Sequence, residues 1–286
     1  MDLLEVRGLS KRYKGFSLED ISFSIPPGFI MGYIGQNGAG KTTTLNAITH
    51  LTRADRGEVF LDGRSFYEDP AGYRGEIGYV GDGFHFPVDM TQGDIKKILK
   101  SFYPRFDGQQ YETYMEKWDL PKKMKLKKYS RGMKVKLMFA AALSKDTKLL
   151  ILDEATNGLD PVVRREILGL LQDYIADGRK SVLFSTHIME DLQNIADYIF
   201  FIDQGKKILF DTKDELVDNF LLVKGGLENL QPELERVLIG IERKEYGFLA
   251  LYDTRREGIL PAGLTVEKPS IDEIVVHIID AKTKSF

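Results

Sequence analysis

The sequence predicts an α/β fold with a parallel β-sheet at its core. Three short, mostly apolar runs at 29–34, 149–152 and 181–185 are typical of strands buried on both faces, as in parallel sheets. Segments with the apolar spacing of helices separate these runs, and the longest spans about 88–145. Apolar and polar residues alternate within 3–25, which indicates two half-buried antiparallel strands. We therefore expect an N-terminal antiparallel β subdomain and an inserted α-helical subdomain beside the parallel sheet.

The composition narrows the class of protein. The chain has 286 residues, of which 43% are hydrophobic and 29% charged, and its net charge of −3 does not suit a protein that coats nucleic acid. It contains no cysteine, which excludes disulfides and thiolate metal sites. Residues 1–7 lack the basic start and apolar run of a signal peptide, and no stretch approaches the roughly 18 apolar residues of a membrane-spanning helix. Any role at a membrane is therefore expected to come through a partner.

A glycine-rich stretch at 35–42 fits the phosphate-binding pattern G-x-x-x-x-G-K-[ST] at every required position. A buried strand precedes it and a helix begins near Thr43, so backbone N–H groups and the positive end of the helix dipole would surround an anion. Lys41 would reach the β- and γ-phosphates of a nucleoside triphosphate, and the Thr42 hydroxyl would ligate Mg²⁺. The residues expected to bind the nucleotide in this stretch are Gly35, Gln36, Asn37, Gly38, Ala39, Gly40, Lys41, Thr42 and Thr43.

Two carboxylates follow the buried strand at 149–152. Asp153 and Glu154 stand at its carboxyl end, where ligands bind in open α/β sheets, and an acid there completes the Mg²⁺ shell of phosphate-binding proteins. His187 follows the next buried strand, so we expect it at the same edge of the sheet. The sequence thus predicts a site at this edge of the sheet that contains Lys41, His187 and the acids Asp153 and Glu154, one of which would complete the Mg²⁺ shell with Thr42.

Two features leave alternatives open. Tyr13 lies in a short polar link between the first two expected strands, either as an ordinary loop aromatic or as a stacking platform for a purine base. Lysines at 122, 123, 125, 127 and 128 form a charge run, which is usually a solvated face.

Beyond about residue 220 the sequence pattern changes. The expected elements there are a strand at 221–223, a helix near 227–238, a hairpin turning at Tyr246 and a last helix opened by Ser270. They predict a small α+β appendage, so we expect an ATP-binding domain at 1–220 and an accessory domain at 221–286. Earlier in the chain, Thr91 and Asp160 stand where helix caps are expected.

Together these residues resemble the ATP-binding subunit of an ABC transporter over about 1–220, and most closely the ATPases that serve ABC-2 type exporters. The resemblance implies a P-loop NTPase core. The matching residues are Tyr13 as the base-stacking aromatic, Gly35 to Thr42 as the Walker A loop, Ser130, Arg131 and Gly132 in the signature, Asp153 at the end of Walker B, Glu154 as the catalytic carboxylate, Asp160 in the D-loop and His187 as the switch histidine.

Two positions depart from the family's pattern. The signature Leu-Ser-Gly-Gly-Gln is here Tyr-Ser-Arg-Gly-Met at 129–133, so Arg131 puts a cation where the family has glycine, while Ser130 and Gly132 are kept. At the Q-loop, Asp82 stands in place of glutamine; it is shorter, and it cannot donate a hydrogen bond when it is ionised. The family's contact from this position to Mg²⁺ and the attacking water is therefore either lost or made through water.

The resemblance also implies a mechanism. Two copies, or one copy and a paralogous ATPase, would dimerise head to tail around two Mg²⁺-ATP molecules. Each γ-phosphate would lie between one subunit's phosphate loop and the helix start of its partner, at Ser130 and Gly132. Lys41 and Mg²⁺ would neutralise charge, Glu154 would accept a proton from water, and His187 would sense the γ-phosphate.

The partner that the resemblance implies is a separate integral membrane permease, gripped by the helical segment at 88–145. The chain would then lie on the cytoplasmic, inner face of the cell membrane and power transport, with export favoured, and no nucleic-acid partner is expected. One alternative is a soluble ABC ATPase that acts on nucleic acid, the ribosome or an assembly complex, which the lysine run keeps open. Another is a catalytically idle regulatory subunit, given Asp82 and Arg131, although Asp153 and Glu154 are both retained.

Overall fold

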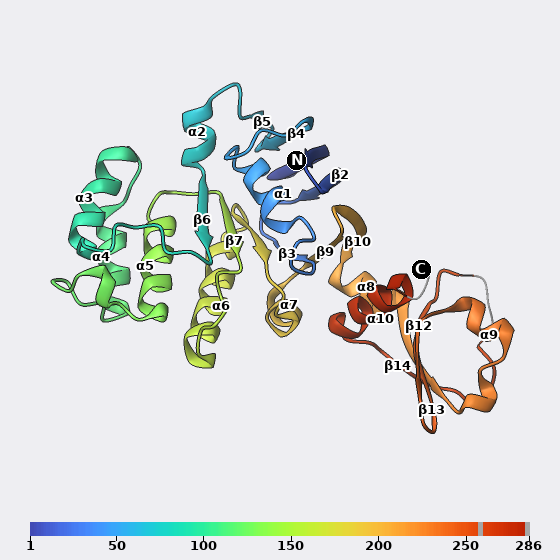
Figure 1. The fold of residues 1–286 in the computed structure, drawn as a ribbon. Coiled ribbons are helices and arrows are strands. Elements are labelled where there is room, and N and C mark those ends of the chain that lie inside the picture. Colours follow the sequence, from blue (N-terminus) through green and yellow to red (C-terminus); the bar gives the residue numbers. More distant parts are fainter. Residues whose placement is uncertain (257–259, 284–286) are drawn as a thin grey trace. The chain divides into compact units, whose positions relative to one another are not determined.

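The structure is a computed structural model that describes residues 1–256 and 260–283. It divides into two compact units: the first consists of residues 1–188 and 198–210, and the second combines residues 189–197 with the chain from 211 onward (Figure 1). The second unit therefore takes in two short segments, 189–197 and 211–220, that the sequence placed within the ATP-binding part. The expected domain boundary between residues 220 and 221 stays a prediction.

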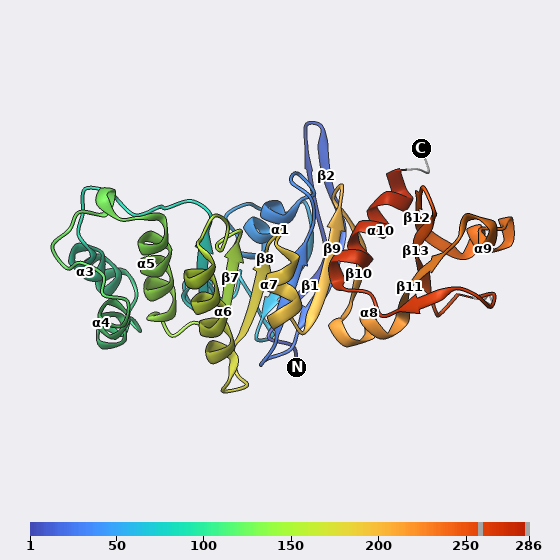
Figure 2. The ribbon, with the colours of Figure 1, turned by 90° about the horizontal axis from the view of Figure 1, so that it is seen from below.

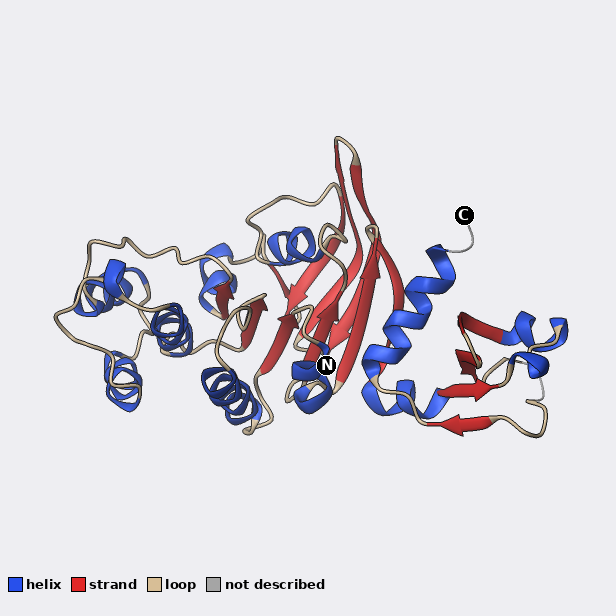
Figure 3. Cartoon of the chain, turned by 60° about the horizontal axis from the view of Figure 1, so that its bottom comes forward, coloured by secondary structure: helices blue, strands red, loops and turns tan. Residues whose placement is uncertain are grey.

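Within the described residues, the first unit is built on a ten-stranded mixed sheet, seen in red in Figure 3. The strands lie in the order β5-β4-β1-β2-β10-β9-β3-β8-β7-β6. Their bounds are β1 (Leu4–Tyr13), β2 (Phe16–Ile25), β3 (Ile30–Ile34), β4 (Arg56–Leu61), β5 (Arg64–Ser65), β6 (Ile77–Gly81), β7 (Leu149–Asp153), β8 (Ser181–Ser185), β9 (Tyr198–Asp203) and β10 (Lys206–Thr212). Strands β6, β7, β8, β3 and β9 pair in parallel, whereas β1 pairs antiparallel with β2 and β4. The predicted antiparallel β subdomain is thus continuous with the parallel sheet.

The parallel strands are buried because both faces of the sheet are covered. Leu149, Leu150, Ile151 and Leu152 in β7 are all fully buried. The covering helices of this unit include α1 (Lys41–Ile48), α2 (Pro70–Gly75) and α6 (Pro161–Ile175). Helix α6 has its buried stripe at Ile167, Leu170 and Leu171, as its sequence spacing predicts.

A group of helices is inserted between β6 and β7, and Figure 2 shows them gathered together. They are α3 (Gln92–Phe102), α4 (Gly108–Lys117), a short 3₁₀ turn (Leu126–Lys128) and α5 (Arg131–Leu143). Helix α3 begins with the predicted capping box: the Thr91 side chain accepts from the Asp94 N–H, and the Asp94 carboxylate accepts from the Thr91 N–H. The inserted helical subdomain at about 88–145 is therefore present.

In the described part of the second unit, four strands form an antiparallel sheet in the order β12-β13-β11-β14. Its elements are α7 (Met189–Ile195), α8 (Lys213–Asn219), β11 (Phe220–Gly225), α9 (Pro232–Val237), β12 (Leu238–Lys244), β13 (Gly247–Asp253), β14 (Thr265–Glu267) and α10 (Ile271–Thr283). Helix α10 packs on β12 and β13, and Ser270 caps it through Glu273 as predicted. Together with the core of the first unit, this is the predicted fold class.

Two local predictions were wrong. The single helix expected near 227–238 is instead a 3₁₀ turn (Leu227–Asn229) followed by α9, which starts at Pro232, and Leu238 already opens β12. Pro232 has no backbone N–H to continue a helix but suits the first helical position, so the chain restarts there. Tyr13 lies in no polar link: it is the last residue of β1 and is paired with Phe16 of β2.

Candidate functional site

The phosphate-binding loop connects β3 to α1 at the carboxyl edge of the sheet. Gly40 is the N-cap of α1 with φ +112°, a left-handed conformation that side chains disfavour. A Cβ atom at Gly40 would also lie 3.0 Å from the Phe16 ring, so the loop has no room for one. Lys41 is buried and folds back on the loop, where its Nζ donates to the backbone oxygens of Gly35 at 2.7 Å and Gln36 at 3.4 Å. The loop therefore surrounds a fixed cation, as a phosphate cradle requires.

Asp153 ends β7 between two other strand ends: Gly81 of β6 and Ser185 of β8 are its register partners. Thr42 Oγ1 donates to Asp153 Oδ2 at 2.9 Å, and Ser185 Oγ donates to Oδ1 at 3.2 Å. The Tyr79 hydroxyl lies 3.4 Å from Oδ2; burial, with the Asp153 charge beside it, raises the pKa of Tyr79 and keeps its hydroxyl protonated. The paired Thr42 hydroxyl and Asp153 carboxylate are the hard oxygen ligands that Mg²⁺ prefers.

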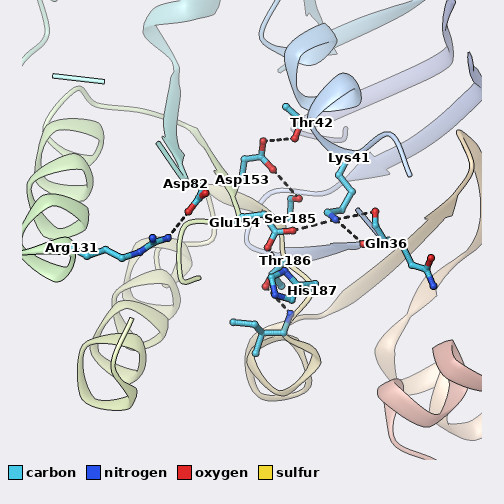
Figure 4. A network of polar contacts seen from close by, with 12 residues as sticks. Gln36, Lys41, Thr42, Asp82, Arg131, Asp153, Glu154, Ser185, Thr186 and His187 are labelled. Atoms are coloured by element: carbon cyan, nitrogen blue, oxygen red, sulfur yellow. Dashed lines mark hydrogen bonds and ion pairs between the residues drawn. The ribbon is translucent and has the colours of Figure 1, made fainter. Parts of the chain in front are cut away.

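Glu154 lies between two potential cations (Figure 4). Its Oε1 lies 3.2 Å from Lys41 Nζ, and its Oε2 lies 2.6 Å from His187 Nδ1. Oε1 is buried, and no described residue donates a well-aligned hydrogen bond to it. An acceptor left open in this way is placed to receive a hydrogen bond from a further group, such as a water molecule.

The backbone at Glu154 is held in an uncommon conformation. Its φ is +54°, in the left-handed region where a long side chain costs roughly 1 kcal/mol. The Glu154 N–H donates to Ser185 O at 2.9 Å, and the Glu154 carbonyl accepts from the Asn157 N–H at 3.1 Å. Two backbone hydrogen bonds thus fix the direction of the carboxylate, and strain of this kind is concentrated at functional sites.

His187 follows β8 at the same edge of the sheet, as the sequence predicts. Thr186 before it is fully buried, and the Thr186 hydroxyl accepts from the Ile188 N–H at 3.0 Å, which fixes the turn. The His187 side chain is 47% exposed, so about half of it remains accessible. The structure therefore brings Lys41, Glu154 and His187 together, while their roles stay predictions.

Tyr13 borders a pocket of about 490 Å³ beside the phosphate-binding loop. The pocket is lined by Arg12, Tyr13, Gly15, Phe16, Ser17, Gly38 and Gln204. Because Gly38 belongs to the phosphate-binding loop, a group in this pocket would lie next to a bound phosphate chain. The Tyr13 side chain is partly exposed, as a stacking platform must be.

The expected signature and D-loop residues begin two helices. Ser130 is the N-cap of α5, and its Oγ accepts from the Met133 N–H at 3.2 Å. Asp160 is the N-cap of α6 and accepts from two backbone N–H groups, those of Val162 at 3.1 Å and Val163 at 3.0 Å. Both side chains therefore already have capping roles within this chain.

Asp82 and Arg131, the two departures from the family's pattern, form an ion pair with each other (Figure 4). The Asp82 carboxylate thus has a cationic partner outside the Thr42–Asp153 pair. The expectation that its contact to Mg²⁺ is lost or made through water stays a prediction.

Sequence reasoning missed Ser185 and Tyr79 as partners of Asp153. Ser185 is the polar last residue of an apolar strand, β8, which neighbours the strand of Asp153, and this could have marked it. Tyr79 carries no such signal, because one aromatic in a buried strand is ordinary core.

No helix in the described ranges 1–256 and 260–283 is long and apolar enough to cross a membrane.

Comparison with known proteins places the chain in a family. The ABC transporter family profile matches residues 18–157. The chain is 30% identical over 223 residues to the ABC transporter ATP-binding protein YtrB of Bacillus subtilis, covering 78% of this chain and 76% of that protein. It is 32% identical over 225 residues to the Nod factor export ATP-binding protein I of Ralstonia nicotianae, covering 75% and 68%.

A solved structure of the ATP-binding subunit of an ABC transporter has a similar fold. It superposes with a TM-score of 0.69 at 27% identity and covers 76% of this chain and 92% of the solved one. Membership of the family implies ATP as the bound nucleotide and a membrane permease as partner, and the alternative of a soluble, non-transport ATPase finds no support. The chain belongs to the ABC transporter ATP-binding proteins and is the ATP-hydrolysing subunit of such a transporter.

Proposed function

We propose that the residues around Glu154 form the centre that hydrolyses ATP and that Glu154 is its general base. The observation that carries the proposal is the Glu154 carboxylate, set between Lys41 and His187 and next to the Thr42–Asp153 pair. In hydrolysis a water oxygen attacks the γ-phosphorus, the bond to the bridging oxygen of ADP breaks, and the water proton passes to the base. Glu154 Oε1 is buried, directed toward Lys41 and open to one more donor, so it suits the proton-accepting atom.

Lys41 would neutralise phosphate charge in this proposal. Its ammonium lies at the loop, where it donates to Gly35 O and is 3.2 Å from Glu154. From there it would contact the β- and γ-phosphates of ATP, next to the carboxylate that acts on water. The remaining residues of the cradle, from Gly35 to Thr43, supply backbone N–H groups at the start of α1.

Thr42 and Asp153 are the residues that would hold Mg²⁺. Their oxygens are 2.9 Å apart, and the Ser185 hydroxyl orients the carboxylate from its other side. When bound, the ion supplies charge neutralisation at the β- and γ-phosphates. The half-exposed side chain of His187 is proposed to sense the γ-phosphate. Tyr13 is proposed to stack on the adenine in the pocket beside Gly38.

The active form in this proposal is a head-to-tail dimer, made with a second copy or a paralogue. Ser130 and Gly132 at the start of α5 would face the partner's γ-phosphate, with Arg131 beside them in the signature, and Asp160 would contribute through its loop. The start of α5 is a plausible anion site because its N–H groups and dipole point outward from an exposed serine cap.

We further propose that the permease is gripped by the helices at 88–145 and that the chain lies on the cytoplasmic face of the membrane. Export is the favoured direction of transport, because the similar Ralstonia protein is named an export ATP-binding protein. The second unit would stabilise or regulate the dimer.

The test is a mild-detergent pull-down of the full-length, tagged Glu154→Gln chain from its native membranes with Mg²⁺-ATP, alongside Lys41→Ala as the control. Glutamine cannot accept the proton, so Glu154→Gln should be held in the ATP-bound dimer, whereas Lys41→Ala should not bind ATP well enough to form it. Recovery of a polytopic membrane protein in stoichiometric amount, with an ATP-dependent dimer absent from the control, supports the proposal. A monomer under both conditions, recovered with ribosomal or nucleic-acid proteins, contradicts it.

A further inference from the structure

Asp82 and Arg131 are 49 positions apart in the chain and meet at the edge of the nucleotide site. Arg131 Nη2 donates to Asp82 Oδ1 in a short ion pair. The two side chains are 51% and 57% exposed, so the pair lies at the surface of this site and not in the core. Asp82 and Arg131 are the two positions that depart from the family's pattern, and they pair with each other.

The guanidinium of Arg131 also contacts the loop after Glu154. A Cβ atom at Gly158 would lie 3.3 Å from Arg131 Nε and 3.4 Å from Cζ, so the guanidinium packs closely over this glycine. Gly158 has φ +64°, which also disfavours a side chain there. Arg131 is therefore held on one side by a carboxylate and on the other by the backbone of the D-loop.

Each of the three segments joined by Arg131 adjoins a residue of the proposed centre. Asp82 directly follows Gly81, the register partner of Asp153. Gly158 is four residues after Glu154 on the loop that leads to Asp160. Arg131 itself follows Ser130, the N-cap of α5.

Electrostatics gives a reason why this chain has both Asp82 in place of the family's glutamine and Arg131 in place of its glycine. Arg131 occupies the first turn of α5, where the helix dipole presents partial positive charge and a cation is unfavourable. An anion beside it removes that penalty, and Asp82 supplies the anion. Glutamine at position 82 could not, because it carries no charge.

We propose that Asp82 and Arg131 act as one positioning pair for ATP hydrolysis. The pair fixes the start of α5, and with it Ser130 and Gly132, relative to the segments that carry Asp153 and Glu154. Asp82 acts through Arg131. The inference rests on the proposed role of Ser130 and Gly132 toward the γ-phosphate.

The test compares kcat and KM for ATP in the full-length chain. Asp82→Asn and Arg131→Gln each remove one charge, and we expect kcat to fall about tenfold in each, by analogy with the coupling of contacting charged residues. KM should change less than about twofold, because Lys41 and the loop at 35–43 bind the nucleotide without either residue. The melting temperature should change by less than about 2 °C, because exposed ion pairs add little to stability.

The decisive variant exchanges the charges, Asp82→Arg with Arg131→Asp. If the pair acts by positioning, the swapped ion pair should restore kcat to within about threefold of the original chain. Aspartate also suits the first turn of α5 by its charge. The matched control is the pair of Lys206 and Glu19, at 3.4 Å with 64% and 51% exposure, where Lys206→Gln and Glu19→Gln should leave kcat unchanged.

Two outcomes overturn the inference: single variants with an unaltered kcat, or a charge swap no better than the single variants. The second would mean that Arg131 acts on some other anion, such as a partner's phosphate. The ATP-dependent dimer of Glu154→Gln is measured in a separate experiment. If that dimer does not form but the charge swap restores kcat, the proposed dimer is rejected and the positioning role of the Asp82–Arg131 pair is retained.

Discussion

At the scale of single residues, the site depends on where two neighbouring carboxylates point. Asp153 is the last residue of β7, and its side chain is turned to Thr42 and Ser185. Glu154 has left the strand with positive φ, and its side chain is turned to Lys41 and His187. One peptide bond thus separates the two proposed roles, a ligand of Mg²⁺ and a base.

Tyr13 provides the prediction at this scale. If its ring stacks on adenine, Tyr13→Ala should weaken ATP binding by about 1–3 kcal/mol, whereas Tyr13→Phe should bind nearly as the original chain does, because stacking needs the ring alone. Isothermal titration with ATP measures both variants. An unchanged affinity for ATP in Tyr13→Ala would show that Tyr13 does not bind the nucleotide and is an ordinary aromatic at the end of a strand.

At the scale of elements, local sequence rules worked where the ends of helices and strands carry their own signals. Thr91, Asp160 and Ser270 begin α3, α6 and α10 as their side chains predict, since a cap acts within a few residues. The rules failed at 227–238, where the apolar spacing allows a helix but Pro232 interrupts it and the last residue pairs in a strand. Sheet pairing decides such short runs, and it is set by residues far away in the chain.

The Asp82–Arg131 contact shows the same limit within the site. The motifs predicted that Lys41, Glu154 and His187 would meet, because parallel strands end at one edge of the sheet. No such rule relates a residue after β6 to the first turn of α5. Their pairing emerges only when the helices at 88–145 are folded against the sheet.

The turn after helix α5 packs a half-buried cation against strand β6, and this cation makes stability depend on pH. The Lys145 ammonium donates to Ile77 O at 3.1 Å and lies 4.3 Å from the Tyr103 ring centre, and burial lowers the pKa of Lys145 from 10.5 to about 8. The folded chain thus holds this proton less tightly than the unfolded chain, so stability should rise as pH increases from about 8 to 10.5.

Lys145→Met should remove that rise. Between pH 7.5 and 9.5, the free energy of unfolding of the original chain should increase by about 1–2 kcal/mol more than that of the variant. Urea unfolding at the two pH values measures the difference, and Lys100→Met, at an exposed lysine of α3, is the control. Equal pH dependence in the original chain and Lys145→Met would show that the Lys145 ammonium is not desolvated.

At the scale of the whole molecule, the chain has two compact units with separate hydrophobic cores. Ile151 in β7 belongs to the core of the first unit, and Ile274 in α10 is buried in the second. Units with their own cores commonly unfold in separate steps. The segment that carries α7 follows His187 and Ile188 in the chain yet belongs to the second unit, so chain connectivity joins His187 directly to that unit.

Matched truncations test the division. Ile151→Ala and Ile274→Ala each remove the same fully buried side chain, at a cost of about 2–5 kcal/mol. In scanning calorimetry, each variant should lower the melting temperature of a different transition. A single transition lowered equally by both variants would show that the two units unfold as one.

The central claim is that Glu154 is the base of the ATP-hydrolysing centre, and the most direct measurement is the rate of phosphate release by Glu154→Gln beside its equilibrium affinity for ATP. The account predicts a kcat at least about 100-fold below that of the original chain, with ATP affinity retained, because the variant keeps the phosphate-binding loop and loses only the proton acceptor. Glu166→Gln, at an ion-paired glutamate of α6, should hydrolyse ATP at the original rate. A Glu154→Gln chain that releases phosphate at nearly the original rate would contradict the account.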